Sequence, residues 1–412
     1  MQKTHIIFLI LAAFLFIGCQ GVGAGALPTL AAAAMVPDPT EGVPPTFTLP
    51  PATAVPTATD IFIRDTATPS RTPLPIPTLT PFTPKPTNTV TSTVLPNFTP
   101  TPPPIIKPVD QYLYHEVMPY QAFPVPPGDN GWGMHWIPTV SQGREAVDKY
   151  VAELVKMHIK WVVFLNDGTN IGDNDYLVDK LVANGIMPVM RLYRAGVLPY
   201  DDGVGELVRH YRARGVYYYQ IYNEPNVNVE NHQGFANPNQ YAIAWAQTAR
   251  EVVNNGGLPG IGAFSPGGEY SHYEFLDRTL RAIKFNGDEA LLNHAWLSIH
   301  NYHGTRAYDD PDGFLLFRNY DQIVNSHLGR SLPMVGTEGG SYSADPQAAK
   351  NMLIYQYTYM RNAEPYLLAF SYWVLANHAA GGNDATWEWQ SLFKEGGWVH
   401  PVVTEFFYQT AR

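Results

Sequence analysis

The chain of 412 residues contains a single cysteine, Cys19. One cysteine cannot form a disulfide within the chain, so burial of apolar side chains must stabilise the fold. Basic residues are also few, with 26 Lys and Arg against 36 Asp and Glu and a formal net charge of −10. With no basic stripe, this balance argues against nucleic acid or anionic lipid as a partner.

The N-terminal apolar run, residues 6–17, is too short for a transmembrane helix, which needs about 20 residues. Lys3 precedes the run, and the sequence Phe-Ile-Gly-Cys at 16–19 follows it. This ending resembles a bacterial lipobox, although Phe16 replaces the usual Leu. We interpret residues 1–19 as a lipoprotein signal peptide, with Cys19 lipidated and the protein anchored on the extracellular face of a bacterial membrane. An ordinary secretory signal, which would release the protein, is the alternative.

Residues 20–108 are dominated by proline and threonine, and 20 of the 37 prolines lie between residues 37 and 108. Such a segment has too few apolar side chains to offset the entropy lost on ordering, and its prolines favour extended polyproline II structure. We predict a disordered stalk that separates the following domain from the membrane.

From residue 109 to residue 412, β-branched and aromatic runs alternate with amphipathic helical patterns. The predicted strands are 131–138, 160–167, 187–194, 217–226, 259–266, 295–303, 332–340 and 366–377. The main predicted helices are 143–159, 174–185, 203–214, 237–257 and 345–363. Asn237 or Asn239 is placed to cap the fourth helix, and Gly185 and Gly256 to end the second and fourth.

Eight strands alternating with helices predict a (β/α)8 TIM barrel over 109–412. A doubly wound open sheet is the alternative, but no Gly-x-Gly-x-x-Gly turn follows the first strand, so a dinucleotide fold has no support.

Two glutamates end strands of this predicted barrel. Glu224 follows the fourth strand in YYYQIYNEPN, and Glu338 lies in the seventh, in PMVGTEGG. The active sites of such barrels lie at the C-terminal strand ends, so these carboxyl groups are expected to face each other. A pair of carboxyl groups is what glycoside hydrolysis requires, one as acid and base and one as nucleophile in the retaining reaction.

With Asn223-Glu224-Pro225 in register with Glu338, residues 109–412 resemble glycoside hydrolase clan A, the cellulase-like (β/α)8 retaining enzymes. The segment GWVHPVVTEFFYQ at 397–409 also looks like the closing segment of that clan. The resemblance implies that Glu224 is the acid/base and Glu338 the nucleophile. It also implies that Asn223 bonds the sugar 2-hydroxyl and the nucleophile.

Further substrate-binding residues are expected around this pair. By the same resemblance, His300 lines the subsite of the cleaved sugar, Tyr302 orients Glu338, and Trp373 forms the floor. Trp136 is a second candidate for stacking on a sugar. Arg191 either binds substrate, holds one of the two glutamates ionised, or pairs with Asp167 as part of the scaffold.

The strand ends also show departures from the cellulase family. That family carries an Arg at the second strand end and a His pair after the third, whereas this chain has Asn166-Asp167 and Arg191-Leu192-Tyr193. The pattern favours other branches, such as the β-xylosidase and α-iduronidase family, so we assign the clan and leave the family open.

The expected function is therefore retaining hydrolysis of a polysaccharide or oligosaccharide by a monomeric enzyme without cofactor. A zinc site is rejected because His300 and His303 have no third ligand at a recognisable spacing. A non-catalytic surface barrel that binds glycans is the alternative function, and a structural envelope protein is another. The presence of both glutamates argues against a pure binder.

Overall fold

The computed structural model describes residues 106–200, 202–341, 343, 345–378 and 385–410. The predicted signal peptide 1–19, its Cys19 and almost all of the predicted stalk 20–108 lie outside these residues. Within the described residues, no helix combines the length and the hydropathy that crossing a membrane requires.

Eight parallel strands form a closed barrel in sequence order, because each strand pairs with the next and β1 also pairs with β8. The predicted TIM barrel is confirmed. The strands are β1 Trp132–His135, β2 Trp161–Asp167, β3 Met187–Tyr193, β4 Tyr218–Ile221, β5 Leu258–Phe264, β6 Trp296–Gly304, β7 Met334–Ser341 and β8 Leu367–Tyr372.

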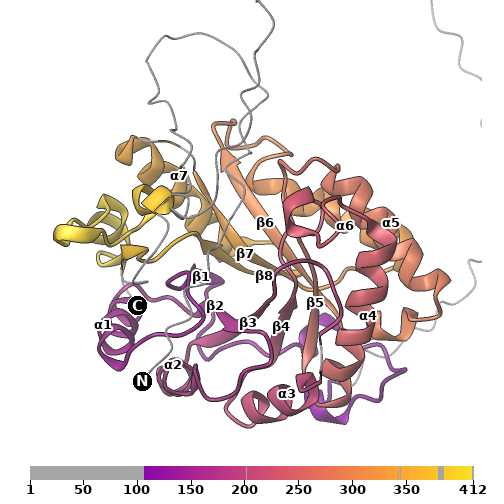
Figure 1. Cartoon of the computed structure of the whole chain (residues 1–412). Helices are drawn as coiled ribbons and strands as arrows, with labels where there is room; N and C mark the ends of the chain where they lie inside the picture. The colour runs from indigo at the N-terminus through magenta and orange to yellow at the C-terminus, as the bar shows by residue number, and fades with distance from the viewer. Residues whose placement is uncertain (1–105, 201, 342, 344, 379–384, 411–412) are drawn as a thin grey trace, which may run out of the picture. The chain divides into compact units, whose positions relative to one another are not determined.

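Helices follow the strands and cover the outside of the barrel (Figure 1). The helices are α1 Arg144–Lys156, α2 Asp175–Ala183, α3 Val204–Arg212, α4 Pro238–Asn254, α5 His272–Phe285, α6 Phe317–Leu328 and α7 Pro346–Tyr359. Short helical turns lie in the connections, and one of them, η3 Asn228–Glu230, follows β4.

Local signals in the sequence set the helix ends. Asn237 caps α4, because its side chain accepts hydrogen bonds from the backbone N–H groups of Asn239 and Gln240. Gly256 follows the same helix with φ of 78°, and Gly185 follows α2 with φ of 65°. Both conformations favour glycine, which has no Cβ to clash with the backbone.

Aromatic side chains fill the barrel interior toward the N-terminal ends of the strands. The ring of Tyr218 packs edge-on against Trp161 and Trp296, with centroids 5.4 and 5.6 Å apart. The hydroxyl of Tyr218 donates to the backbone oxygen of Pro124 at 2.7 Å, which ties the segment before β1 to this end. Tyr219 points to the helix layer instead, where its hydroxyl donates to the backbone oxygen of Val208.

The C-terminal turn Val403–Phe407 packs back onto β1, near the start of the barrel. Phe406 and Phe407 lie 5.4 and 5.6 Å from the Trp132 ring, and Phe407 also meets Tyr357 of α7 at 4.8 Å. Inside the barrel, the rings of Trp161, Tyr218 and Trp296 fill this end, so the polar residues at the opposite strand ends are left to form a site.

Candidate active site

The C-terminal strand ends gather polar side chains that are almost fully buried. They are His135 of β1, Arg191 of β3, Asn223 and Glu224 after β4, His300 of β6 and Glu338 of β7. Burying charged groups is unfavourable unless each finds a partner, so the contacts among them decide what the site can do.

Glu338 is 1 % exposed and is held by two side chains. Nη1 of Arg191 donates to its Oε1 at 2.5 Å, and the hydroxyl of Tyr302 donates to its Oε2 at 2.9 Å. Burial acts to raise the pKa of Glu338, but the positive charges of His300 and Arg191 and the Tyr302 hydrogen bond lower it below its ordinary value. Glu338 is therefore kept as a carboxylate.

Glu224 is 5 % exposed, and its backbone has φ of 33°. A non-glycine residue in the left-handed region is uncommon and costs free energy that the surroundings must offset. The backbone N–H of Glu224 donates to the oxygen of Ala263 at 3.0 Å, and the N–H of Val227 donates to the Glu224 oxygen at 2.8 Å. The tight turn after β4 thus fixes where this carboxyl group lies.

His300 connects the two glutamates. Its Nδ1 lies 2.8 Å from Oε1 of Glu224, and its Nε2 lies 3.6 Å from Oε1 of Glu338. The position follows from the barrel, since His300 and Glu338 are paired in the β6–β7 register. One imidazole ring therefore reaches both carboxyl groups, which come from β7 and from the turn after β4.

Asn223 directs its side chain to a third carboxyl group. Its Nδ2 donates to Oε1 of Glu230 at 3.0 Å, while its Oδ1 has no partner among the described residues. Removal from water raises the pKa of Glu230 to about 7, and the negative charge of Glu224 adds to the rise. Glu230 thus adds a third carboxyl group beside the Glu224–Glu338 pair.

Trp373 follows β8 and is buried at the same end of the barrel. Its ring lies 4.2 Å from the His135 ring and 5.8 Å from the Trp387 ring. Trp136 is also buried, but its ring packs edge-on against Tyr150 of α1 at 6.3 Å. No hydrogen bond or ring contact among the described residues links Trp136 to the two glutamates.

The contacts of Arg191 distinguish pairing with a glutamate from pairing with Asp167. The guanidinium bonds Glu338, while Asp167 lies half-buried at the end of β2 and accepts from Asn170 at 3.1 Å. Arg191 is 1 % exposed, so its guanidinium contacts Glu338 rather than an open surface. Asn166 is also buried and donates to backbone oxygens of its own loop, at Gly168 and Asn170.

Sequence reasoning missed two residues of this site. His135 ends β1, so the rule that located Glu338 at a strand end could have located it too. Its buried ring has a pKa lowered to about 3, mainly because burial disfavours the charged form, so it is neutral near neutral pH. Glu230 lies six positions after Glu224 in a turn, where no strand-end rule applies.

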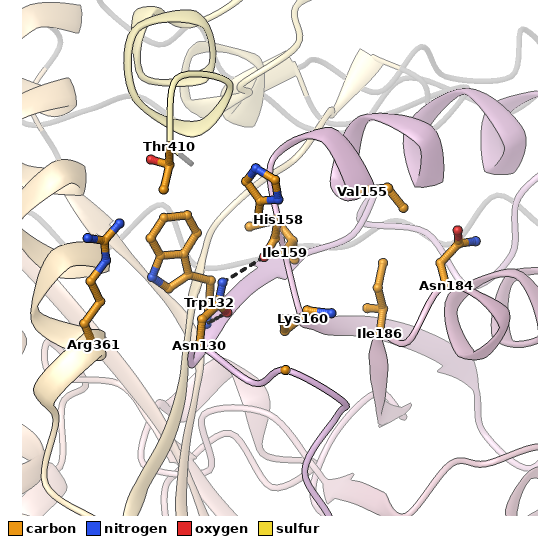
Figure 2. A pocket seen from close by; sticks show the side chains of 11 residues that line it. Asn130, Trp132, Val155, His158, Ile159, Lys160, Asn184, Ile186, Arg361 and Thr410 are labelled. Atoms are coloured by element: carbon orange, nitrogen blue, oxygen red, sulfur yellow. Dashed lines mark hydrogen bonds between the residues drawn. The ribbon is translucent and has the colours of Figure 1, made fainter. Parts of the chain in front are cut away.

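A cavity of about 590 Å³ lies at the opposite end of the barrel. Trp132, Lys160 and Ile186, at or just before the starts of three strands, line it together with His158 and Arg361 (Figure 2). None of the described residues that line it is acidic. The paired carboxyl groups Glu224 and Glu338 therefore lie away from this cavity, at the C-terminal ends of the strands.

The described residues contain no group of three or more His, Cys, Asp or Glu side chains that could hold a metal ion. The polar side chains at the C-terminal strand ends instead form hydrogen bonds with one another. Arg191 and Tyr302 bond Glu338, His300 bonds Glu224, and Asn223 bonds Glu230.

No protein-family model and no curated protein matches this chain. Among solved structures, it is similar to a GH39 β-xylosidase from Caulobacter crescentus, with 16 % identity and a TM-score of 0.51 over 69 % of this chain and 71 % of that one. A GH128 endo-β-1,3-glucanase from Sorangium cellulosum aligns with 16 % identity and a TM-score of 0.45 over 68 % of this chain and 99 % of that one. The chain thus shares a (β/α)8 barrel fold with the β-xylosidase at low identity.

Proposed function

We propose that this protein is a retaining glycoside hydrolase in which Glu338 is the nucleophile and Glu224 the acid/base. The observation that carries the proposal is that two buried carboxyl groups beside one imidazole ring, those of Glu224 and Glu338, have different bonding partners. Glu338 is held as a carboxylate by Arg191 and Tyr302, while the one side chain that bonds the Glu224 carboxyl group among the described residues is His300. Two carboxyl groups in different environments are suited to different roles.

In the first step of the proposed reaction, Oε of Glu338 attacks the anomeric carbon and the glycosidic bond breaks. Glu224 gives its proton to the departing oxygen, so the products are a glycosyl ester on Glu338 and a free alcohol. In the second step, Glu224 takes a proton from water, and the resulting oxygen attacks the anomeric carbon. The ester bond breaks, Glu338 leaves as a carboxylate, and the sugar keeps its configuration.

The change of role of Glu224 follows from the charge on its partner. In the first step Glu224 gives up its proton and becomes a carboxylate, while the Glu338 carboxylate becomes a neutral ester. Ester formation removes the negative charge of Glu338, so the Glu224 carboxylate that remains meets no second carboxylate and serves as base toward water. His300 contacts both carboxyl groups, so its hydrogen bonding is coupled to both steps.

We propose that Asn223 and the aromatic ring of Trp373 bind the substrate. The free Oδ1 of Asn223 can accept from a sugar hydroxyl, and the Trp373 ring can stack on a sugar face. The β-xylosidase that shares the fold makes β-xylosides the first substrates to test. The carbohydrate is the proposed partner, and the protein is proposed to act as a monomer without a cofactor.

The proposed place of action is outside the cell. The predicted signal peptide and lipidation at Cys19 would attach the protein to the extracellular face of a bacterial membrane, and the Pro/Thr-rich stalk would extend the barrel away from it. A polysaccharide is too large to enter a cell, so this location suits the proposed substrate.

The test is hydrolysis of aryl β-xylosides, other aryl glycosides and a polysaccharide panel, with the anomeric form of the first product followed by NMR. We expect cleavage with retention, and loss of cleavage in Glu224→Gln and Glu338→Gln proteins that remain folded. Inversion would refute the nucleophile assignment. Binding of glycans without any cleavage would favour the non-catalytic glycan-binding barrel.

A further inference from the structure

Glu230 lies outside the strand-end pair, yet the loop that carries it is firmly held. The amide of Asn226 accepts from the N–H of Ser265 at 2.8 Å and donates to the oxygens of Ser265 and Tyr270 at 2.8 and 3.0 Å. Nδ2 of Asn231 donates to the oxygens of Pro225 and Val227. Two buried asparagines, on either side of η3, therefore fix the loop between β4 and α4.

This loop brings Glu230 into contact with Asn223, the residue before Glu224. The contact is the 3.0 Å hydrogen bond from Nδ2 of Asn223, which leaves the Asn223 oxygen without a partner among the described residues. An amide has a donor end and an acceptor end, whereas an ionised carboxylate only accepts. An ionised Glu230 therefore binds the nitrogen end of Asn223 and leaves the oxygen end free.

Charged groups from three strand ends surround Glu230. Burial is the largest influence on its pKa, the negative charges of Glu224 and Glu338 raise it further, and the positive charge of Arg191 opposes the rise. Burial raises the pKa of Tyr193, the last residue of β3, and the negative charge of Glu230 adds to the rise. The pKa of about 7 places the proton change of Glu230 near neutral pH.

We propose that Glu230 is a positioning residue of this site: it fixes the Asn223 amide with its oxygen free to accept a hydrogen bond from a hydroxyl group of the bound sugar. The inference rests on the proposed function and adds a residue to it. Glu230 does not touch the reacting atoms and acts through Asn223. It also makes the orientation of the Asn223 amide depend on whether the Glu230 carboxyl group is protonated.

The dependence has a definite sign. Above pH 7 the Glu230 carboxylate can only accept, so the Asn223 oxygen remains available to the sugar. Below that pH, protonated Glu230 can donate to the Asn223 oxygen once the amide rotates, which occupies the acceptor that the sugar needs. Catalytic efficiency should therefore fall as the pH falls through about 7.

The test measures kcat/KM against pH for 2,4-dinitrophenyl β-xyloside with the full chain. Its leaving group needs no proton, so Glu224 as acid does not shape the profile. We expect the wild-type value to fall about tenfold across the Glu230 ionisation, the cost of about one hydrogen bond. In Glu230→Gln the glutamine still accepts from Asn223 but cannot ionise, so its profile should be flat through that pH.

Glu269→Gln is the matched control. Glu269 holds the same loop by accepting from the backbone N–H of Asn228 at 2.9 Å, but it does not contact Asn223. Its profile should follow the wild type. Glu230→Ala, which loses the bond altogether, should lower kcat/KM about tenfold at every pH. In an Asn223→Ala background, Glu230→Gln should have no further effect, because the residue through which it acts is gone.

Infrared difference spectra supply a readout that does not need activity. A protonated-carboxyl band should disappear from the wild-type protein as the pH rises through about 7 and be missing from Glu230→Gln. Wild-type cleavage together with an unchanged Glu230→Gln profile, or without this band, overturns the inference and leaves the proposed function intact. A wild-type protein that cleaves no glycoside overturns both.

Discussion

Nη1 of Arg191 lies 2.5 Å from Oε1 of Glu338, and each residue is 1 % exposed. Such a pair costs desolvation on both sides, but removing one partner leaves the other charge buried without compensation. The pair therefore links the stability of the barrel to the ionisation of the proposed nucleophile.

Arg191→Met should lower the free energy of unfolding by about 3–5 kcal/mol, measured by denaturant titration. It should also raise the pKa of Glu338, because a positive charge that lowers it is lost. A lowered carboxyl pKa stabilises the fold above its unfolded value, and this contribution disappears as the pH falls through the folded value. Measured in a Glu230→Gln background, so that Glu230 does not contribute, the acid limb of the kcat/KM profile should accordingly move to higher pH in the variant.

Arg194→Met provides the comparison for that experiment. Arg194 follows β3 and lies over the Tyr200 ring at 5.3 Å, away from Glu338. It should change neither the acid limb nor, by more than about 1 kcal/mol, the stability. An Arg191→Met protein with an unmoved acid limb would show that the guanidinium does not control Glu338.

Glu338→Gly should be inactive and recover cleavage of aryl glycosides when azide is added. Azide can occupy the space of the missing carboxylate and attack the anomeric carbon in its place, so the glycosyl azide should have inverted configuration. NMR of the glycosyl azide measures its anomeric configuration. A variant that stays near wild-type activity without azide would remove Glu338 from the mechanism.

Glu224→Gly should lose activity mainly on substrates whose leaving groups need a proton. With a dinitrophenyl glycoside the first step should persist, the glycosyl ester should accumulate, and added azide should give a product of retained configuration. Burst kinetics and NMR measure both effects. An equal loss on good and poor leaving groups would contradict the acid role.

Gly339→Ala should disturb the residue next to Glu338. A Cβ at Gly339 would lie 2.5 Å from a ring carbon of Phe370 and 3.2 Å from the backbone oxygen of Asn301. Overpacking of this kind costs about 1–3 kcal/mol, to be read from thermal unfolding, and should lower kcat as β7 shifts. Gly143→Ala, where no atom lies within 4 Å of the added Cβ, should leave kcat unchanged. Because Gly143 is the N-cap of α1, where alanine is less favourable, its cost in stability should stay below about 1 kcal/mol.

Cys19→Ser should prevent attachment of the protein to membranes. Cells fed a radiolabelled fatty acid should label the wild-type protein and not the variant, because the thioether needs the cysteine sulfur. The variant should move to the soluble fraction or keep its signal peptide. Equal labelling of both proteins would contradict the lipoprotein interpretation.

Most of the barrel was predictable because its strands are short buried runs between helices of clear amphipathic pattern. The strand predicted at 366–377 was wrong at its end, since β8 stops at Tyr372. The chain beyond it remains buried, as Val374 and Leu375 show, so apolar composition alone could not mark where pairing stops.

Site residues that lie at strand ends could be predicted from the sequence. Contacts that depend on the direction of a side chain or on the path of a loop could not. Glu338 and His300 lie on neighbouring strands, and the barrel order brings them together. The choice of Arg191 between Glu338 and Asp167 depends on which way a long side chain extends. Glu230 depends on a loop held by side-chain amides, for which residue spacing gives no signal.

The pairing of β1 with β8 has a consequence for how the chain is made. A ribosome releases the strands in order, so β1 waits for its second neighbour until the eighth strand has emerged. The turn after β4 and the glutamate of β7 are therefore synthesised well before the ring can close around them. For the proposed export, late closure of this kind would leave the chain unfolded while it crosses the membrane, and the proposed activity would be acquired only on the far side.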